Sequence, residues 1–432
     1  MNVRRARRPS DDTLPGLPAR RAVLRLLDAV LRRGDPLETA LHAATQGLSN
    51  PADKALTHAI TADVLRWMVD LDALIDGATA RALPDDAKPR MVLRLALVQL
   101  LCLGTPAHAV LATALPLVDG GPRRLVHGVL GTLIRSGARL PQYPTLPPEV
   151  AARWAGQWGE ASTEAAARAL GDRPPIDVTL ADPSETGAFA EALGGESLMP
   201  GHVRIGHDAT IPALPGFAEG RWWVQDLASS LPARLAGPGE GRRAFDLCAA
   251  PGGKTMQLAA QGWKVTALDR SAKRLERLAQ NLARSGLSAD VMQADALLWE
   301  PAGEADLVLL DAPCSATGIF QRHPDVLYRA GERQIAELAA QQATMLIRAA
   351  QWVRPGGMLI YATCSLERTE GEDRIAGFLT GHPEFSIYPP RHGELPPGIT
   401  ADPHGCIRTL PGMLADRGGL AGFFIARLVR EV

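Results

Sequence analysis

The second half of the chain alternates short apolar strands with helical segments, and several of these strands end on an aspartate. Because strands joined through helices run parallel and carry the helices on their faces, the alternation predicts an α/β domain with a doubly wound parallel sheet. Such a sheet binds its ligand at the carboxyl ends of the strands. The predicted strands are residues 244–247, 264–268, 289–293, 305–310, 358–362 and 422–428, and the predicted helices are 253–261, 272–285 and 334–353.

The first part of the chain has a helical pattern that no strand interrupts. Val23, Leu27 and Val30 recur at three- and four-residue spacing, as on one face of a helix. Asn50 followed by Pro51 is typical of a helix start, because asparagine caps the first turn and proline needs no N–H partner there. Further helices are predicted over residues 89–103, 106–118 and 122–136, which gives an all-α domain of five or more helices.

Changes in composition divide the chain into four segments. The arginine-rich N-terminal tail is predicted to be disordered, with an arm that contacts RNA phosphates as the alternative. The proline-rich stretch 141–148 is predicted to be an extended linker. It precedes a small α+β module with a helix at 150–170 and strands at 176–180, 202–205 and 222–224. The expected segments are the tail at 1–16, the all-α domain at 17–140, the α+β module at 150–240 and the α/β domain at 241–432.

The charge of the chain is distributed unevenly. The 432 residues carry a net charge of −1, yet residues 1–140 contain 19 basic and 13 acidic side chains. An excess of basic groups in one part of a near-neutral protein favours a polyanionic partner such as RNA.

Several other classes of protein are disfavoured. No apolar run reaches the ~18 residues that a membrane span requires, and the N-terminus lacks the apolar segment of a secretory signal. The five cysteines lie far apart without a Cys-x-x-Cys pair, which disfavours a zinc site and a disulfide framework. We therefore expect a cytoplasmic protein with no membrane association and no metal, and the sequence identifies no protein partner.

The stretch Asp-Leu-Cys-Ala-Ala-Pro-Gly-Gly-Lys-Thr at 246–255 follows the first strand of the α/β domain, where glycines let a ligand approach the backbone. It lacks the Gly-x-Gly-x-x-Gly of dinucleotide sites, and Cys248 stands where a P-loop needs glycine. Asp269, Asp295 and Asp311 end or follow the next three strands. These carboxylates would repel a pyrophosphate but suit the ribose, the adenine and the sulfonium of S-adenosyl-L-methionine. Taken singly, each aspartate could equally cap a helix or fill a turn.

Two cysteines are predicted to lie beside this ligand. Cys314 belongs to Asp-Ala-Pro-Cys-Ser-Ala-Thr-Gly after one strand, and Cys364 belongs to Thr-Cys-Ser after the next strand. Adjacent parallel strands bring their carboxyl ends together, so both thiols should flank one pocket. Amino-group methyltransferases usually carry an aromatic residue where Cys314 stands, so the cysteine indicates sulfur chemistry instead. The alternatives are inert core thiols or a disulfide, which a reducing compartment disfavours.

Three motifs together resemble the RNA cytosine-C5 methyltransferases of the NOL1/NOP2/Sun family: Asp-x-Cys-Ala-Ala-Pro-Gly-Gly-Lys-Thr, Asp-Ala-Pro-Cys-Ser-x-Thr-Gly and Tyr-x-Thr-Cys-Ser. Arg-His-Pro-Asp at 322–325 and Gly-Phe-Phe-Ile-Ala-Arg at 422–427 also match the family pattern. The helical domain, with Leu-Arg-Leu-Ala-Leu-Val-Gln-Leu at 93–100, resembles the NusB-type RNA-binding domain. The resemblance implies a class I Rossmann-like methyltransferase domain, S-adenosyl-L-methionine as cofactor and small-subunit (16S) rRNA as substrate.

The resemblance also implies roles for single residues. Cys364 would add to carbon 6 of cytosine and so enable carbon 5 to attack a methyl sulfonium, while Cys314 would assist product release. DNA cytosine methyltransferases attack with the Pro-Cys cysteine, so the sequence chemistry alone leaves these two roles open. Asp311 would hydrogen-bond the cytosine, and Lys254 would either lower the pKa of a thiol or orient Asp311. The implied cofactor-binding residues are Cys248, Ala249, Ala250, Pro251, Gly252, Gly253, Lys254, Asp269, Asp295 and Asp311.

The chain departs from the family pattern in three places. Residues 176–180 lack the arginine and asparagine of a Leu-Arg-Val-Asn-like strand, Ala421 replaces an aspartate, and the loop at 413–419 is unusual. These departures bear on RNA contacts rather than on the chemistry. The alternative functions are the same reaction on a tRNA, or a non-catalytic RNA-binding assembly factor.

Overall fold

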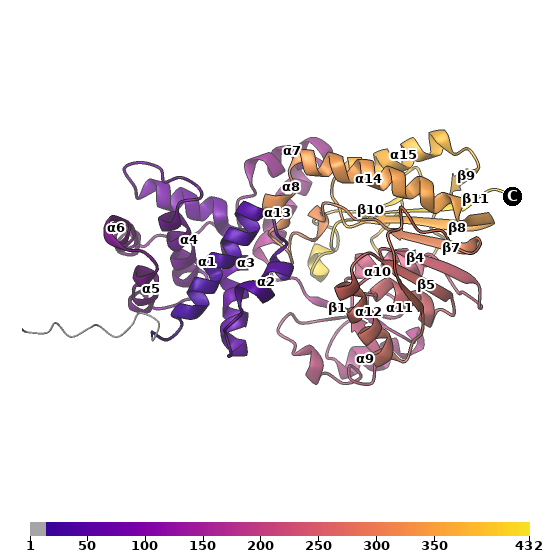
Figure 1. Ribbon diagram of the computed structural model, residues 1–432, viewed down its shortest axis with the longest axis horizontal. Coiled ribbons are helices and arrows are strands. Elements are labelled where there is room, and N and C mark those ends of the chain that lie inside the picture. Colours follow the sequence, from indigo (N-terminus) through magenta and orange to yellow (C-terminus); the bar gives the residue numbers. More distant parts are fainter. Residues whose placement is uncertain (1–13) are drawn as a thin grey trace, which may run out of the picture. The chain divides into compact units, whose positions relative to one another are not determined.

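The structure, a computed structural model, describes residues 14–432, which form two compact units (Figure 1). The first unit comprises the chain up to Ala152 together with His323–Arg329, and the second comprises Arg153–Arg322 and Ala330–Val432. Residues 1–13 of the tail predicted at 1–16 lie outside the described residues. Among the described residues, the structure contains no helix that is both long and apolar enough to span a membrane.

Residues 14–152 of the first unit form helices joined by loops, with no strand, which confirms the all-α prediction for this part of the chain. Its helices are α1 (Leu17–Arg33), α2 (Leu37–Ala44), α3 (Pro51–Gly77), α4 (Lys88–Leu101), α5 (Ala107–Ala114), α6 (Gly120–Arg135) and α13 (Val326–Arg329). Residues 90–99 of α4 are all buried, so this helix forms the centre of the unit. Asn50 caps α3 as predicted, since its Oδ1 accepts the N–H of Ala52 at 2.9 Å.

A large sheet forms the centre of the second unit. Its strands are β4 (Arg243–Leu247), β5 (Lys264–Asp269), β6 (Asp290–Gln293), β7 (Ala305–Asp311), β8 (Val353–Thr363), β9 (Phe385–Ile387), β10 (Ile407–Thr409) and β11 (Phe423–Arg430). They follow the order β10-β11-β8-β7-β4-β5-β6, with β9 paired to β11. The pairs among β4 to β8 are parallel, as predicted.

The sheet is mixed rather than wholly parallel, because β11 runs antiparallel to its neighbours β8, β9 and β10. The cause is the return of the chain: β10 has the direction of β8 and ends at the carboxyl edge of the sheet. β11 therefore starts at that edge and runs back, so that Phe424 pairs with Thr363. This arrangement brings the start of β11 next to the end of β8.

Helices cover both faces of this sheet, which confirms the doubly wound fold (Figure 1). On one face α10 (Leu227–Arg234), α11 (Gly253–Ala260) and α12 (Ala272–Ser285) bury Leu231, Leu258 and Leu278. On the other face α14 (Glu332–Gln351) and α15 (Glu372–Gly381) bury Leu346 and Phe378.

A small antiparallel sheet precedes this fold, in the order β2-β1-β3. β1 (Ile176–Leu180), β2 (His202–Ile205) and β3 (Trp222–Val224) have the predicted bounds, and α9 (Thr186–Ala192) packs beside them. The single helix predicted at 150–170 is instead two helices, α7 (Pro148–Trp158) and α8 (Glu160–Gly171). Gly159 separates them because its φ of 81° interrupts the helical backbone.

Candidate active site

The loop after β4 shapes the first part of the site. Gly252 precedes α11 with a φ of 107°, which favours glycine, and a Cβ on it would lie 3.0 Å from Cγ of Leu278. Gly253 faces Gln225, and a Cβ there would lie 3.2 Å from its Cδ. These glycines and Pro251 therefore form the turn, while Ala249 and Ala250 are buried behind it. A cavity of about 80 Å³ adjoins the loop at Cys248 and is also lined by Asp269, Arg274, Asp295, Pro313 and Met345, among others.

Asp269 and Asp295 thus share one cavity, but each carboxylate already accepts at least one hydrogen bond. Buried Asp269 accepts the N–H of Ala250 at 3.3 Å and pairs with Arg274 at 3.0 Å. Exposed Asp295 accepts the N–H of Leu297 at 2.9 Å, which is the turn-capping role considered as the alternative. A ribose at Asp269 must therefore share the carboxylate with Arg274 or displace that side chain, which is 54% exposed.

Asp246 provides a direct test of the fit to a cationic cofactor. Its side chain is fully buried, and its Oδ2 accepts the hydroxyl of Thr255 at 2.6 Å. Its Oδ1 has no hydrogen-bond partner among the described residues. Burial raises the pKa of Asp246 to about 7. A buried carboxylate oxygen without a partner, beside a glycine loop, fits a cationic group such as that of S-adenosyl-L-methionine.

Lys254 and Asp311 form an ion pair at the carboxyl edge of the sheet. Nζ of Lys254 lies 2.7 Å from Oδ2 of Asp311 and 3.2 Å from the hydroxyl of Ser229 on α10. The same ammonium lies 5.6 Å from the centre of the Phe423 ring at the start of β11. The elements α10, α11, β7 and β11 thus meet at the buried ammonium of Lys254.

Cys314 and Cys364 lie in direct contact, with their Sγ atoms 3.4 Å apart. They follow β7 and β8, which are parallel neighbours. The hydrogen bond with Cys364 and burial together raise the pKa of Cys314 well above its ordinary value. The remaining thiols are separate from this pair, and burial raises the pKa of each to about 12, so they stay protonated at neutral pH; they are Cys102, Cys248 and Cys406.

Three further polar residues lie at this pair and were missed by the sequence reasoning. Ser315 and Ser365 directly follow the two cysteines, and their hydroxyls are 3.1 Å apart. Both hydroxyls donate to the buried carboxylate of Glu370. The only signal in the sequence was the Cys-Ser pair that occurs after two consecutive strands.

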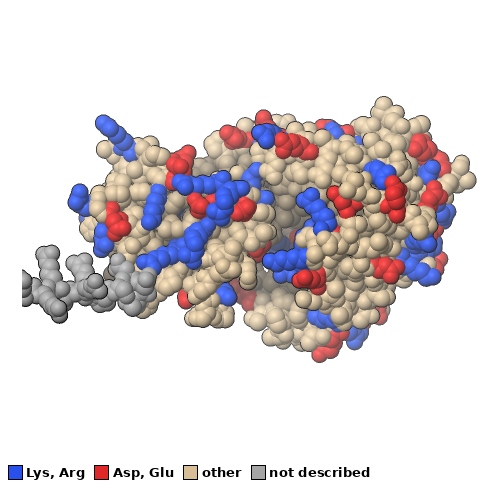
Figure 2. Space-filling view, viewed as in Figure 1, with Lys and Arg blue, Asp and Glu red and all other residues tan. Residues whose placement is uncertain are grey.

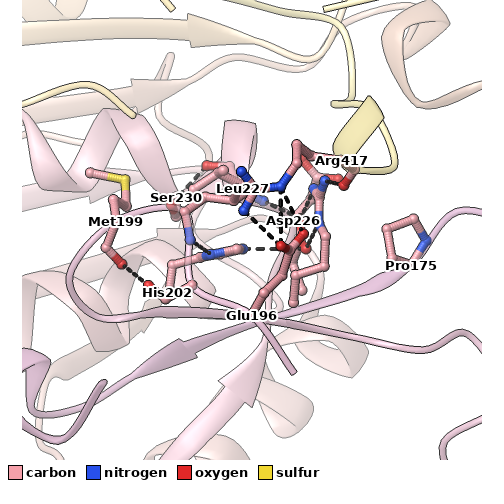
Figure 3. Close-up of polar contacts among 12 residues, drawn as sticks. Pro175, Glu196, Met199, His202, Asp226, Leu227, Ser230 and Arg417 are labelled. Carbon is pink, nitrogen blue, oxygen red and sulfur yellow. Dashed lines mark hydrogen bonds and ion pairs between the residues drawn. The ribbon is translucent and has the colours of Figure 1, made fainter. Parts of the chain in front are cut away.

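The unusual β1 strand has a structural explanation in an ion-pair network (Figure 3). Asp177 lies opposite Arg204 of β2 and makes a bidentate pair with it, at 2.7 and 2.9 Å. Oδ2 of Asp177 also accepts the N–H of Leu227 at the start of α10, at 3.0 Å. The acidic residue in β1 is therefore a structural anchor for α10, the helix that carries Ser229.

The same network holds the unusual loop at 413–419. Arg204 donates to the backbone carbonyl of Arg417, and the Arg417 side chain pairs with Glu196 at 2.6 Å (Figure 3). Ala421, at the end of the loop, lines a small crevice together with Arg204 and Asp226. Two arginines, Arg204 through its side chain and Arg417 through its pair with Glu196, thus fasten the loop to the small sheet.

Comparisons with known proteins agree with this architecture. Residues 233–429 match the family described as 16S rRNA methyltransferase RsmB/F, and residues 17–135 match the NusB family. The chain is 34% identical to the ribosomal RNA small subunit methyltransferase B of Klebsiella pneumoniae subsp. pneumoniae, over 94% of this chain and 96% of the relative. It is 35% identical to the protein of the same name from Xanthomonas campestris pv. campestris, over 84% and 88% of the two chains. The crystal structure of PH0851 has a TM-score of 0.73 at 26% identity and covers 96% of this chain and 99% of that one.

Proposed function

The chain belongs to the RsmB/F family of 16S rRNA methyltransferases, and on this basis we propose that it methylates carbon 5 of a cytosine in 16S rRNA through a covalent cysteine–cytosine adduct. It is an rRNA methyltransferase, and its cofactor is S-adenosyl-L-methionine. The observation that carries the covalent mechanism is the contact of two thiols, 3.4 Å apart, beside the Lys254–Asp311 pair.

The chemistry explains why thiols are needed. Carbon 5 of cytosine is a poor nucleophile until another nucleophile adds to carbon 6. The Cys364 thiolate forms a bond to carbon 6, and the electron pair moved to carbon 5 attacks the methyl group. S-Adenosyl-L-methionine, when bound, would supply that methyl group on a positively charged sulfur, and the methyl–sulfur bond would break with its electron pair left on the sulfur as a neutral thioether. The proton on carbon 5 then passes to a base, the bond between carbon 6 and sulfur breaks, and the double bond and the Cys364 thiolate are restored.

The surroundings of the thiols support this division of roles. The contact with Cys364 and burial raise the pKa of Cys314, with Glu370 adding to the effect, so Cys314 keeps its proton at neutral pH. With its proton in place, Cys314 is able to donate a hydrogen bond to Sγ of Cys364, which lies 3.4 Å away. Cys364 is therefore assigned as the nucleophile, and Cys314 assists release of the methylated product.

Asp311 acts on the cytosine rather than on the thiols, and Lys254 acts on Asp311. Asp311 hydrogen-bonds the ring nitrogen and amino group of the cytosine and stabilises the charge of the adduct. Because the direct partner of Lys254 is Asp311, at 2.7 Å, we assign Lys254 the role of orienting that carboxylate. Asp246, Asp269 and Asp295 hold the cofactor at its charged group, ribose and adenine.

The helical unit supplies positive charge for the RNA. Figure 2 shows Lys and Arg side chains across one face of this unit. α6 has no acidic residue and exposes Arg123, Arg124 and Arg135. The module at 150–240 is proposed to add RNA contacts, and the target cytosine must be unpaired or flipped to reach Cys364.

Transfer of labelled methyl groups to unmodified small-subunit rRNA tests the proposal, with the product nucleosides separated by chromatography. Label in 5-methylcytidine is the expected result. Label in another nucleoside would overturn the assigned chemistry. Label in tRNA alone would overturn the substrate, and cofactor binding without transfer to either RNA would favour an RNA-binding assembly factor.

A further inference from the structure

Glu370 lies between the two loops that carry the paired thiols. It ends a single 3-10 turn (Arg368–Glu370) after β8, and its side chain is fully buried. Its Oε1 accepts the backbone N–H of Ser315 and the side-chain amide of Gln342, both at 2.9 Å. Its Oε2 accepts the hydroxyls of Ser315 and Ser365, the latter at 2.5 Å. One carboxylate thus contacts both loops.

These contacts lie one residue away from each thiol. Ser315 follows Cys314, Ser365 follows Cys364, and the two Sγ atoms are 3.4 Å apart. A shift of one loop against the other therefore changes the separation of the sulfur atoms directly. Glu370 bridges the loops at this point, beside the direct contact of the two serine hydroxyls at 3.1 Å.

Glu370 is itself fixed by β8. The hydroxyl of Tyr361 donates to its backbone carbonyl at 2.8 Å, and that of Thr363 donates to the same oxygen at 3.3 Å. All four groups that donate to the carboxylate are neutral. A carboxylate only accepts hydrogen bonds. An amide in its place would present an NH2 group to some of these donors, and those hydrogen bonds would be lost. Packing alone gives no reason to bury such a polar group.

We propose that Glu370 is a positioning residue for methyl transfer. Its carboxylate accepts hydrogen bonds from Ser315 and Ser365 and so sets the separation of Cys314 and Cys364. The consequence for catalysis rests on the proposed covalent mechanism. The separation of the thiols is a property of the folded chain and can be probed without methyl transfer.

Glu370→Gln in the full chain tests this proposal with two readouts. We expect kcat for methyl transfer to fall about 100-fold, because small misplacements of reacting groups have effects of this size, while the KM values for RNA and cofactor change little. The second readout is a glutathione redox equilibrium, in which the two thiols and one oxidised glutathione form a protein disulfide and two reduced glutathiones. Its equilibrium constant should fall about tenfold if the thiols are held less closely.

Glu367→Gln is the matched control. Glu367 is equally buried, but its carboxylate accepts from Trp154 and Gln157 and not from the serines. It should leave kcat and the thiol equilibrium unchanged even if it lowers Tm. Equal losses in both variants, or a Glu370→Gln variant with the wild-type thiol equilibrium, would overturn the proposal.

Ser365→Ala keeps the proposal testable if Glu370→Gln does not fold. It removes one of the hydroxyls that donate to Glu370, and both kcat and the equilibrium constant for disulfide formation should fall. A wild-type protein that transfers no methyl group would contradict the proposed function, whereas the thiol equilibrium would still decide the role of Glu370.

Discussion

Nζ of Lys254 lies 2.7 Å from Oδ2 of Asp311, so the first turn of α11 holds the carboxylate at the end of β7. Burial acts to lower the pKa of Lys254, but the charge and hydrogen bond of Asp311 outweigh it, and the pKa lies above its ordinary value. Lys254 therefore stays charged at neutral pH. The pair connects the glycine loop that is proposed to bind the cofactor to the residue that is proposed to bind the cytosine.

Lys254→Met keeps most of the side-chain volume but removes the charge. We expect kcat to fall about 100-fold, because Asp311 loses the partner that orients it toward the adduct. Steady-state kinetics with labelled cofactor measure the effect. Lys264→Met, at the exposed start of β5, is the control and should behave as the wild type. A Lys254→Met variant with normal kcat would show that Asp311 needs no such orientation.

Replacement of the two thiols should have opposite effects on the adduct. Cys364→Ala should abolish methyl transfer while RNA binding persists, because the nucleophile is lost. Cys314→Ala should instead accumulate a covalent protein–RNA adduct that survives a denaturing gel, because release is impaired. Cys102→Ala, in the helical unit, should show neither effect. The assigned roles would be reversed if Cys364→Ala, rather than Cys314→Ala, formed the adduct.

Asp269 should strengthen cofactor binding, whereas Arg274 should not. Asp269→Asn should raise the Kd for S-adenosyl-L-methionine about tenfold, because hydrogen bonds to a charged acceptor are worth about 1.5–3 kcal/mol. Arg274→Ala should leave the Kd unchanged or lower it, because Arg274 occupies the same carboxylate and carries the same charge as the sulfonium. Calorimetry measures both values. Weaker binding by Arg274→Ala would mean that this arginine helps to hold the ligand.

The sequence was informative where a pattern is local. β1 to β3 were predicted with their bounds, because β1 and β2 alternate apolar and polar residues, β3 is a short apolar run, and turn residues flank all three. The antiparallel direction of β11 was not predicted, since it depends on the edge of the sheet at which the preceding strand, β10, ends. Glu370 was missed for a related reason: its partner Ser315 is 55 residues away in sequence, and no local pattern links the two.

The Asp177–Arg204 pair should contribute strongly to stability. Although burial acts to raise it, the pKa of Asp177 is held well below its ordinary value by Arg204 and His202. Arg204→Met leaves that carboxylate buried without its main partner, so we expect a loss of about 3–5 kcal/mol in the free energy of unfolding. Faster hydrogen exchange should appear in the loop at 413–419.

Arg417→Ala is the matched control for this network, because it removes only the exposed pair with Glu196. A surface pair of this kind contributes about 1 kcal/mol or less. Similar losses for Arg417→Ala and Arg204→Met in urea denaturation would argue against the buried pair as the anchor of the loop.

Asp246 should make the stability of the cofactor-free protein depend on pH. Its pKa is about 7 in the folded chain, against about 3.9 in an unfolded one. As the pH rises between these values, the unfolded chain loses the proton first, so the folded state binds more protons and its stability falls. The loss is on the order of 4 kcal/mol and is complete above about pH 7. Asp246→Asn should flatten the curve of unfolding free energy against pH, measured by urea denaturation, across this range.

Parallel curves for the two proteins would show that Asp246 is ionised in the folded chain. A smaller slope for the wild type with S-adenosyl-L-methionine bound would place a positive charge beside the unpartnered oxygen of Asp246.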